Sequence, residues 1–183
     1  MAKSPKTKFP LAEVVRQWRD GQGWKDEIKL NEEEMRSQLY ADVKLDGDIC
    51  VQLYIETKEN NQWLQIYMYG PIKIPKKRYS ESCELVNAIN KGHVGLGSLM
   101  VSNSEQFLYY QCVYVEGAHL VPTMIDNILG KGYGVFENWN ESMGQVVFAG
   151  ISADEVYRKK MKTLDEESQK VEQDSSDSVP EKL

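Results

Sequence analysis

Apolar residues at helical spacing mark the first recognisable element of the chain. They recur every three or four positions, at Leu11, Val14, Val15 and Trp18. Pro10 suits the first turn of a helix, and glycines at 21 and 23 can end it. The pattern predicts a short amphipathic helix over 10–19. The charged run that follows, at 25–36, favours no particular element.

From residue 37 the hydrophobic period changes from helical to alternating. Segments 37–45, 48–57 and 63–69 each place aliphatic residues at every second position, which predicts three strands. Asp46 and Gly47, between the first two segments, are a strong signal for a hairpin turn. We therefore expect a three-stranded antiparallel meander.

A helical pattern and then two more extended segments follow the meander. Residues 79–91 have helical spacing, and Gly92 can end that helix. Residues 93–101 and 106–116 have the pattern of strands, and a short serine- and asparagine-rich turn separates them. They predict a β-hairpin.

Three glycines divide the helical pattern closer to the C-terminus. Apolar residues return to helical spacing at 121–129, and the segment 135–148 can resume the helix. Between the two segments lie Gly130, Gly132 and Gly134, which are poor helix formers. We expect these glycines to interrupt the helix.

Together these elements predict an α+β fold: a helix, a three-stranded antiparallel meander, a helix, a β-hairpin and C-terminal helices. A five-stranded sheet would pack against the helices. The chain has 183 residues, enough for one core of ordinary size. We expect residues 1–8 to form a flexible N-terminus and residues 9–150 a single domain.

The C-terminal segment, 151–183, has a different composition. Ser152 and Glu155 make a capping box, which predicts the start of a polar helix. The acidic tail from Asp165 to Leu183 is rich in charged and small polar residues. It should be disordered, because it cannot bury enough apolar surface to offset the entropy of ordering.

The second face of the predicted meander is unusually aromatic. Opposite the aliphatic residues lie Tyr54, Trp63, Tyr67 and Tyr69, and the last strand is expected to add Phe107, Tyr109, Tyr110 and Tyr114. A solvent-facing sheet normally carries more charge. We favour cover by the chain's own C-terminal helices, because large exposed apolar patches are unusual on monomers. The alternative is a dimer or partner surface, which aromatic residues suit.

Charge and composition argue against several partners and chemistries. The chain has 22 Lys and Arg against 28 Asp and Glu, a net charge of -6, which disfavours nucleic-acid binding. It has no apolar run of the roughly 20 residues that cross a membrane, and no signal-peptide pattern, so we expect a cytoplasmic protein. Three scattered cysteines and two histidines lack metal-ligand spacing, and no nucleophile has a nearby base. We expect no metal, no cofactor and no enzyme activity.

Two local motifs have ordinary interpretations. The glycine-rich stretch 92–98 lacks the lysine and the following helix of a phosphate-binding loop, so close approach of the backbone to a neighbour is the favoured interpretation. The basic cluster of Lys73, Lys76, Lys77 and Arg78 could attract an acidic partner, but is better explained as solvated surface.

Several segments make the chain resemble the YbjN-like family, described as bacterial sensory-transduction regulators. The likeness lies in the helix that closes on Gly23 and Trp24, in the segment 85–90, and in the strand that follows Gly95. It covers roughly residues 9–130. The charged run at 25–36 and the acidic tail depart from the family pattern.

The resemblance implies a fold similar to type III secretion chaperones. It also implies a non-enzymatic protein that binds other proteins, as a homodimer, with regulatory or chaperone-like consequences. Asn87 and Asn90, one helical turn apart, could contact a ligand or partner. They could equally hydrogen-bond local backbone at a helix end, the commoner role.

We therefore expect an interaction module that offers an aromatic groove to a protein or peptide. The expected partner-binding residues are Tyr54, Trp63, Tyr67, Tyr69, Asn87 and Asn90. The alternative is a small-molecule sensor, with a pocket between the sheet and the C-terminal helices and the glycines at 130–134 as a hinge.

Overall fold

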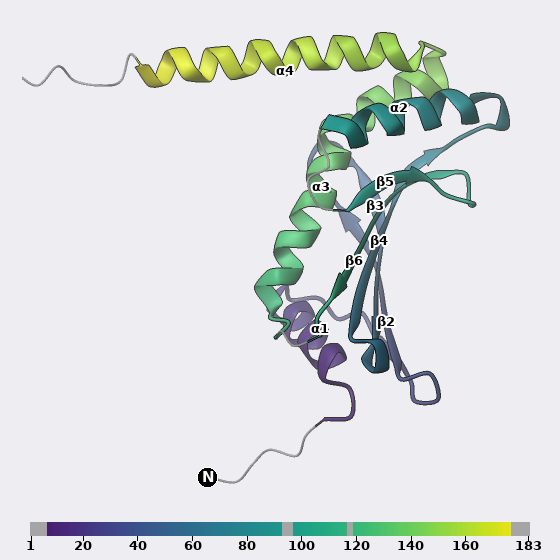
Figure 1. Ribbon diagram of the computed structural model, residues 1–183, viewed down its shortest axis with the longest axis vertical. Coiled ribbons are helices and arrows are strands. Elements are labelled where there is room, and N and C mark those ends of the chain that lie inside the picture. Colours follow the sequence, from purple (N-terminus) through teal and green to yellow (C-terminus); the bar gives the residue numbers. More distant parts are fainter. Residues whose placement is uncertain (1–6, 93–96, 117–118, 177–183) are drawn as a thin grey trace, which may run out of the picture.

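The computed structural model describes residues 7–92, 97–116 and 119–176, which form an α+β fold with one antiparallel sheet (Figure 1). The helices are α1 (Pro10–Gly21), α2 (Tyr79–Gly92), α3 (Pro122–Gly144) and α4 (Ala153–Ser176). The strands are β1 (Ile28–Asn31), β2 (Arg36–Lys44), β3 (Cys50–Lys58), β4 (Trp63–Lys73), β5 (Ser98–Val101) and β6 (Gln106–Tyr114). Figure 1 shows α1 and α3 along one face of the sheet, and α2 and α4 near one end.

The strand order in the sheet is β1-β2-β3-β4-β6-β5. The predicted meander is present as β2, β3 and β4, and the predicted hairpin as β5 and β6. The expected first half of the hairpin, 93–101, is a strand only from Ser98, and residues 93–96 lie outside the described residues. At the first turn, Gly47 (φ 70°) and Asp48 (φ 59°) both adopt the left-handed conformation that this short connection needs.

The prediction of five strands is wrong, because the charged run at 25–36 contains β1. This strand pairs with β2 and places Ile28 opposite Leu39 on the core face. Ile28 is the one buried residue in its burial pattern. A single buried apolar position is too little for an alternating pattern, so the strand depends on pairing with β2.

The aliphatic face of the sheet forms the core under the helices. Its fully buried residues include Leu53, Ile55, Leu64, Ile66, Met68, Phe107 and Tyr109. The last two were expected on the aromatic face, and that placement is wrong. β6 pairs with β4 so that Tyr109 lies opposite Met68, and alternation then puts Tyr110 on the other face, opposite Tyr67.

Helix α3 runs without interruption through all three of its inner glycines, against the prediction of a break. At Gly132, an added Cβ would lie 2.5 Å from the Met68 sulfur and 2.8 Å from Cδ1 of Tyr109. The glycine therefore lets the helix backbone approach the sheet, and this packing outweighs the low helix propensity of glycine. The segment 130–134 is part of a continuous helix and is not the hinge that the sensor hypothesis used.

Gly97 allows a second close approach to the same tyrosine. Its φ is +91°, and a Cβ there would lie 2.6 Å from the Tyr109 hydroxyl. The interpretation of the glycine-rich stretch as a site of close backbone approach is confirmed at this residue. Tyr109 is thus held between Gly97 and Gly132, which explains why it belongs to the core.

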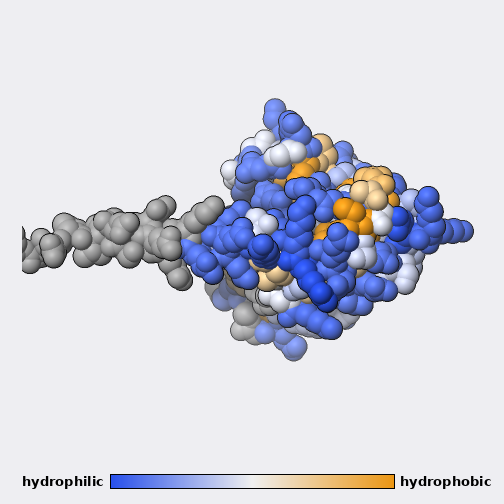
Figure 2. Space-filling view, turned by 90° about the horizontal axis from the view of Figure 1, so that it is seen from above, coloured by the Kyte–Doolittle hydropathy of each residue, from blue (hydrophilic) through white to orange (hydrophobic). Residues whose placement is uncertain are grey.

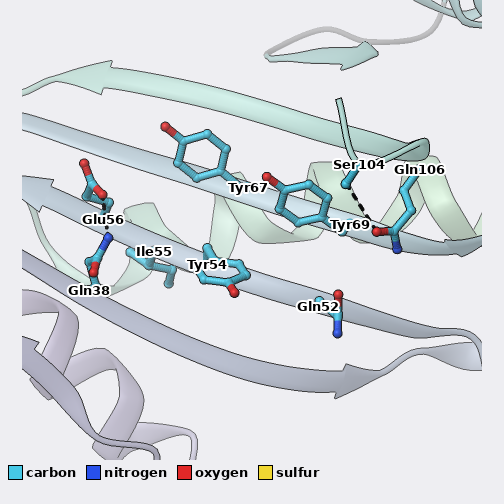
Figure 3. Close-up of a pocket in the computed structure, with 9 residues that line it drawn as sticks. All are labelled: Gln38, Gln52, Tyr54, Ile55, Glu56, Tyr67, Tyr69, Ser104 and Gln106. Atoms are coloured by element: carbon cyan, nitrogen blue, oxygen red, sulfur yellow. Dashed lines mark hydrogen bonds between the residues drawn. The ribbon is translucent and has the colours of Figure 1, made fainter. Parts of the chain in front are cut away.

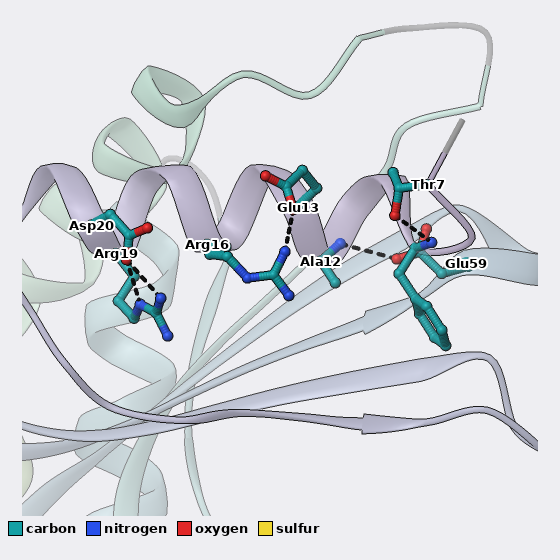
Figure 4. Close-up of polar contacts among 8 residues, drawn as sticks. Thr7, Ala12, Glu13, Arg16, Arg19, Asp20 and Glu59 are labelled. Carbon is teal, nitrogen blue, oxygen red and sulfur yellow. Dashed lines mark hydrogen bonds and ion pairs between the residues drawn. The ribbon is translucent and has the colours of Figure 1, made fainter. Parts of the chain in front are cut away.

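Two helices begin on carboxylates from distant parts of the chain. The Glu59 side chain accepts hydrogen bonds from the backbone N–H groups of Leu11 and Ala12, both at 3.0 Å. Figure 4 shows the bond from Ala12. The Glu81 carboxylate accepts one from the N–H of Ala153 at 2.8 Å. At α1 the Glu59 oxygens take the place of a local N-cap side chain, and at α4 Glu81 satisfies the first N–H group of the helix.

Helix α4 is longer than the sequence predicted. Ser152 accepts a hydrogen bond from the Glu155 N–H, as expected for the start of a polar helix. The helix then continues to Ser176 through much of the predicted disordered tail, and residues 177–183 lie outside the described residues. Tyr157 stacks on Trp139 with ring centroids 5.6 Å apart, and this anchored first part provides the nucleus from which the helix can extend. The division of the chain at residue 150 stays a prediction.

The end of the molecule near α2 and α4 is mainly hydrophilic. Figure 2 looks onto it from above and shows small, separate hydrophobic patches among hydrophilic side chains.

In the described part of the chain, no helix is long and apolar enough to cross a membrane.

Candidate functional site

The face of the sheet opposite the core is rich in aromatic side chains and is not covered by a helix in the described part of the chain (Figure 1). We call this surface the aromatic face. Its aromatic residues are Tyr40, Tyr54, Trp63, Tyr67, Tyr69, Tyr110 and Tyr114. The expectation that the C-terminal helices cover it is wrong. α3 instead packs its buried residues on the aliphatic face, where Gly132 brings it close to the sheet.

Four tyrosines form a row across the middle of the aromatic face. Strand register places Tyr40 opposite Tyr54, Tyr54 opposite Tyr67, and Tyr67 opposite Tyr110. Ring centroids are 4.7 Å apart for Tyr40 and Tyr54, and 5.0 Å apart for Tyr67 and Tyr110. Cross-strand aromatic contacts of this kind stabilise a sheet and fix its side chains. The row therefore presents ordered rings on four neighbouring strands.

Further aromatic pairs flank the row. Tyr69 meets Tyr54 edge to face at 6.0 Å, and Trp63 meets Tyr114 in the same way at 5.3 Å. Tyr54 is 41% exposed and Tyr114 is 65% exposed. The four aromatic residues predicted for partner binding therefore all lie on one surface. Sequence reasoning missed Tyr40, although the alternation of β2 already placed it opposite the aliphatic positions.

A pocket of about 380 Å³ is hollowed into the aromatic face (Figure 3). It is lined by Gln38, Gln52, Tyr54, Ile55, Glu56, Tyr67, Tyr69, Ser104 and Gln106. These residues come from β2, β3, β4, β6 and the turn before β6. Glu56 and Gln38 lie at one end of the pocket, and Ser104 and Gln106 lie at the other.

Glu56 is the one acidic residue that lines the pocket. Its side chain is 15% exposed and accepts a hydrogen bond from the Gln38 amide at 2.9 Å. Arg36 and Lys58 are its ion-pair partners, with nitrogen–oxygen distances of 3.6 Å and 3.8 Å. With one hydrogen bond and two longer ion pairs, the carboxylate keeps part of its acceptor capacity unused.

The pKa values of Tyr40, Tyr67 and Tyr110 on this surface are raised. Burial, with the nearby Tyr110 and Glu56, raises the pKa of Tyr67 to about 12. A hydrogen bond to the Asp42 carboxylate raises the pKa of Tyr40. Burial raises the pKa of Tyr110, although a hydrogen bond from Gln65 acts in the opposite direction. Near neutral pH these three groups therefore remain protonated, and the Tyr40 hydroxyl donates to Asp42.

The two predicted asparagines lie on α2, apart from the aromatic face. The Asn90 amide donates to the Leu99 carbonyl at 2.8 Å and accepts from the Leu99 N–H at 2.9 Å. Asn90 therefore joins α2 to the outer side of β5, and Asn87 is exposed on the same helix. The structure does not bring these residues together with the four aromatic residues.

The sensor hypothesis expected a pocket between the sheet and the C-terminal helices, but core side chains fill that space. Phe136 of α3 and Phe107 and Met68 of the sheet are fully buried between the helix and the strands. The pocket of the aromatic face is on the other side of the sheet. Within 7–92, 97–116 and 119–176, no group of three or more His, Cys, Asp or Glu is arranged to hold a metal ion.

Comparisons with known proteins are sparse. No family model matches the chain, and no curated protein sequence matches it. The chain is similar to a solved structure described as the HopA1-SchA chaperone–effector complex, with 12% identity and a TM-score of 0.48. The match covers 76% of this chain and 99% of the other. Membership of the YbjN-like family stays a prediction.

Proposed function

We propose that this protein is a non-enzymatic interaction module whose aromatic face binds a protein or peptide, with regulatory or chaperone-like consequences. The observation that supports the proposal is the uncovered row of tyrosines with the pocket beside it. Tyrosine and tryptophan contribute large contact areas and are enriched where proteins bind one another.

The construction of the surface suits recognition. The rings stand on strands of a packed sheet, so little side-chain entropy is lost when a partner binds. Glutamine side chains between the rings, such as Gln38 and Gln52, can hydrogen-bond a partner's backbone. An aromatic surface with these amides would bind a polypeptide through both apolar and polar contacts.

A homodimer, expected from the family resemblance, is part of the proposal. Sedimentation and light scattering of the purified protein at tens of micromolar measure it directly. If the protein is a monomer at that concentration, the homodimer is ruled out. Binding of another protein then remains the proposed role.

Capture from a native cell extract tests the proposed function. The wild-type chain is compared with the double variant Tyr54→Ala, Tyr67→Ala and with the control Phe148→Ala. Phe148 is 73% exposed and lies outside the aromatic face, in the π-helical segment Gln145–Ala149 that follows α3. A protein retained by the wild type and the control but lost by the double variant is the expected result. Equal retention by all three would contradict a role for the aromatic face.

A further inference from the structure

We infer that the pocket of the aromatic face accepts an arginine side chain from the partner. This inference rests on the proposed function and specifies the chemistry of the segment that binds. The partner is a polypeptide that presents an arginine to Glu56, with neighbouring residues lying over the tyrosine row.

Charge complementarity is the first argument for a cationic group. The residues that line the pocket include one carboxylate, that of Glu56, and no lysine or arginine. A basic side chain entering the pocket can therefore pair with Glu56.

The aromatic lining is the second argument. Tyr54, Tyr67 and Tyr69 contribute their rings to the pocket, and the Tyr54 and Tyr69 rings are inclined at 78° to each other. A cation is attracted to the face of an aromatic ring, and the planar guanidinium of arginine also stacks on it. The same surface already contains such a contact, because the Lys58 ammonium lies 5.5 Å from the centre of the Trp63 ring.

The unused acceptor capacity of Glu56 is the third argument, and it favours arginine over lysine. Its hydrogen bond comes from Gln38, whereas the ion-pair distances to Arg36 and Lys58 are longer than normal hydrogen bonds. A guanidinium can place two parallel N–H groups on a carboxylate, which an ammonium cannot. Arg36 and Lys58 reduce the net charge near Glu56, so much of the selectivity would come from these directed hydrogen bonds.

The far end of the pocket can bind the rest of the peptide. Gln52, Ser104 and Gln106 line it with amide and hydroxyl groups. Figure 3 shows them away from Glu56, with the tyrosine rings between the two ends. A peptide whose arginine reaches Glu56 would therefore pass over the rings toward these polar groups.

Titration with small probes tests this inference. The amide of acetylated arginine is added to the full chain and followed by NMR at the glutamine side-chain amides. The corresponding citrulline compound, which has nearly the same shape without the charge, is the matched probe. We expect the arginine compound to bind roughly tenfold more tightly, because a hydrogen bond to a charged group contributes on that scale.

Protein variants identify the carboxylate responsible. Glu56→Gln should abolish the preference for arginine over citrulline, whereas Glu84→Gln, at an exposed position of α2, should preserve it. Equal binding of the two probes by the wild type would overturn the inference. So would a preference that survives in Glu56→Gln.

The captured partner separates this inference from the proposed function. If Glu56→Gln retains the partner as tightly as the wild type while the double tyrosine variant loses it, the arginine site is wrong and the interaction module stands. A failure of the proposed function shows differently, as a partner whose capture does not depend on Tyr54 and Tyr67.

Discussion

The same strands build both faces of the sheet, yet neighbouring residues meet opposite surroundings. On β3, Leu53 is fully buried under the helices, whereas the next residue, Tyr54, is 41% exposed. On β4, Met68 is fully buried, and Tyr67 and Tyr69 on either side of it line the open pocket. One alternating sequence therefore encodes a buried core and an exposed aromatic surface at once. Changes on the two faces should have separable effects.

The largest loss of stability should come from the core face. Phe136 of α3 is fully buried and lies against Gly70 of β4, where an added Cβ would be 2.6 Å from the ring. Phe136→Ala removes the ring and leaves a cavity, so we expect the free energy of unfolding to fall by about 3–5 kcal/mol. Denaturant unfolding measures it. A loss below about 1 kcal/mol would mean that the helix is not packed as described.

Alanine substitutions at two glycines of α3 should change the free energy of unfolding in opposite directions. Gly132→Ala forces a methyl group against Met68 and Tyr109 and should cost about 1–3 kcal/mol. Gly130→Ala meets nothing within 4 Å of the new methyl group, and should stabilise the helix by about 0.4–1 kcal/mol. Thermal unfolding of both variants measures the difference. The same sign for both would contradict the close approach of Gly132 to the sheet.

Alkaline pH should act on tyrosines of both faces. Burial raises the pKa of Tyr109 on the core face to about 12, and burial with nearby groups raises that of Tyr67 on the aromatic face to about 12, from an ordinary value of 10.0. The folded state then holds these protons more tightly than the unfolded state. Their contribution to stability is complete below pH 10 and is lost as the pH rises toward 12.

Unfolding at stepped alkaline pH, with tyrosinate absorbance followed in parallel, measures this loss. Tyr109→Phe and Tyr67→Phe should each make the loss of stability above pH 10 less steep. If all tyrosines of the native protein ionised near pH 10, the protective burial would be refuted.

The smallest change in stability should follow a change on the aromatic face. Tyr54→Ala removes an exposed ring and its contacts with Tyr40 and Tyr69, so we expect a loss of at most about 1 kcal/mol. Partner capture should nevertheless fall sharply. A loss of stability comparable to that of Phe136→Ala would show that the aromatic face is part of the core.

The hydrophobic period and the turn residues predicted those elements whose formation depends mainly on the local sequence. The meander, the second hairpin, α1 and α2 were all recognisable, because period and turn residues agree there. The strand β1 was not, since its place depends on pairing Ile28 with Leu39. The continuity of α3 also depends on tertiary packing. A glycine at 132 is favourable only because the helix lies close against Met68 and Tyr109.

The site was predictable only in part. Tyr54, Trp63, Tyr67 and Tyr69 share a face by strand alternation alone. Whether a helix covers that face depends on the side of the sheet on which the helices pack. The hydrophobic period of the strands does not predict that side. Asn90 was a reasonable candidate from its type, but its partner is the Leu99 backbone, which no local pattern connects to it.

The two hydrogen bonds between Asn90 and Leu99 protect one edge of the sheet. The edge of a sheet is a template on which another chain can add a strand. At the β5 edge the Asn90 amide already occupies both the N–H and the C=O of Leu99. At the opposite edge β1 is only four residues long and carries Lys29, and short, charged edge strands resist such growth. A tyrosine-rich face can thus stay exposed while both edges of the sheet resist the addition of a strand.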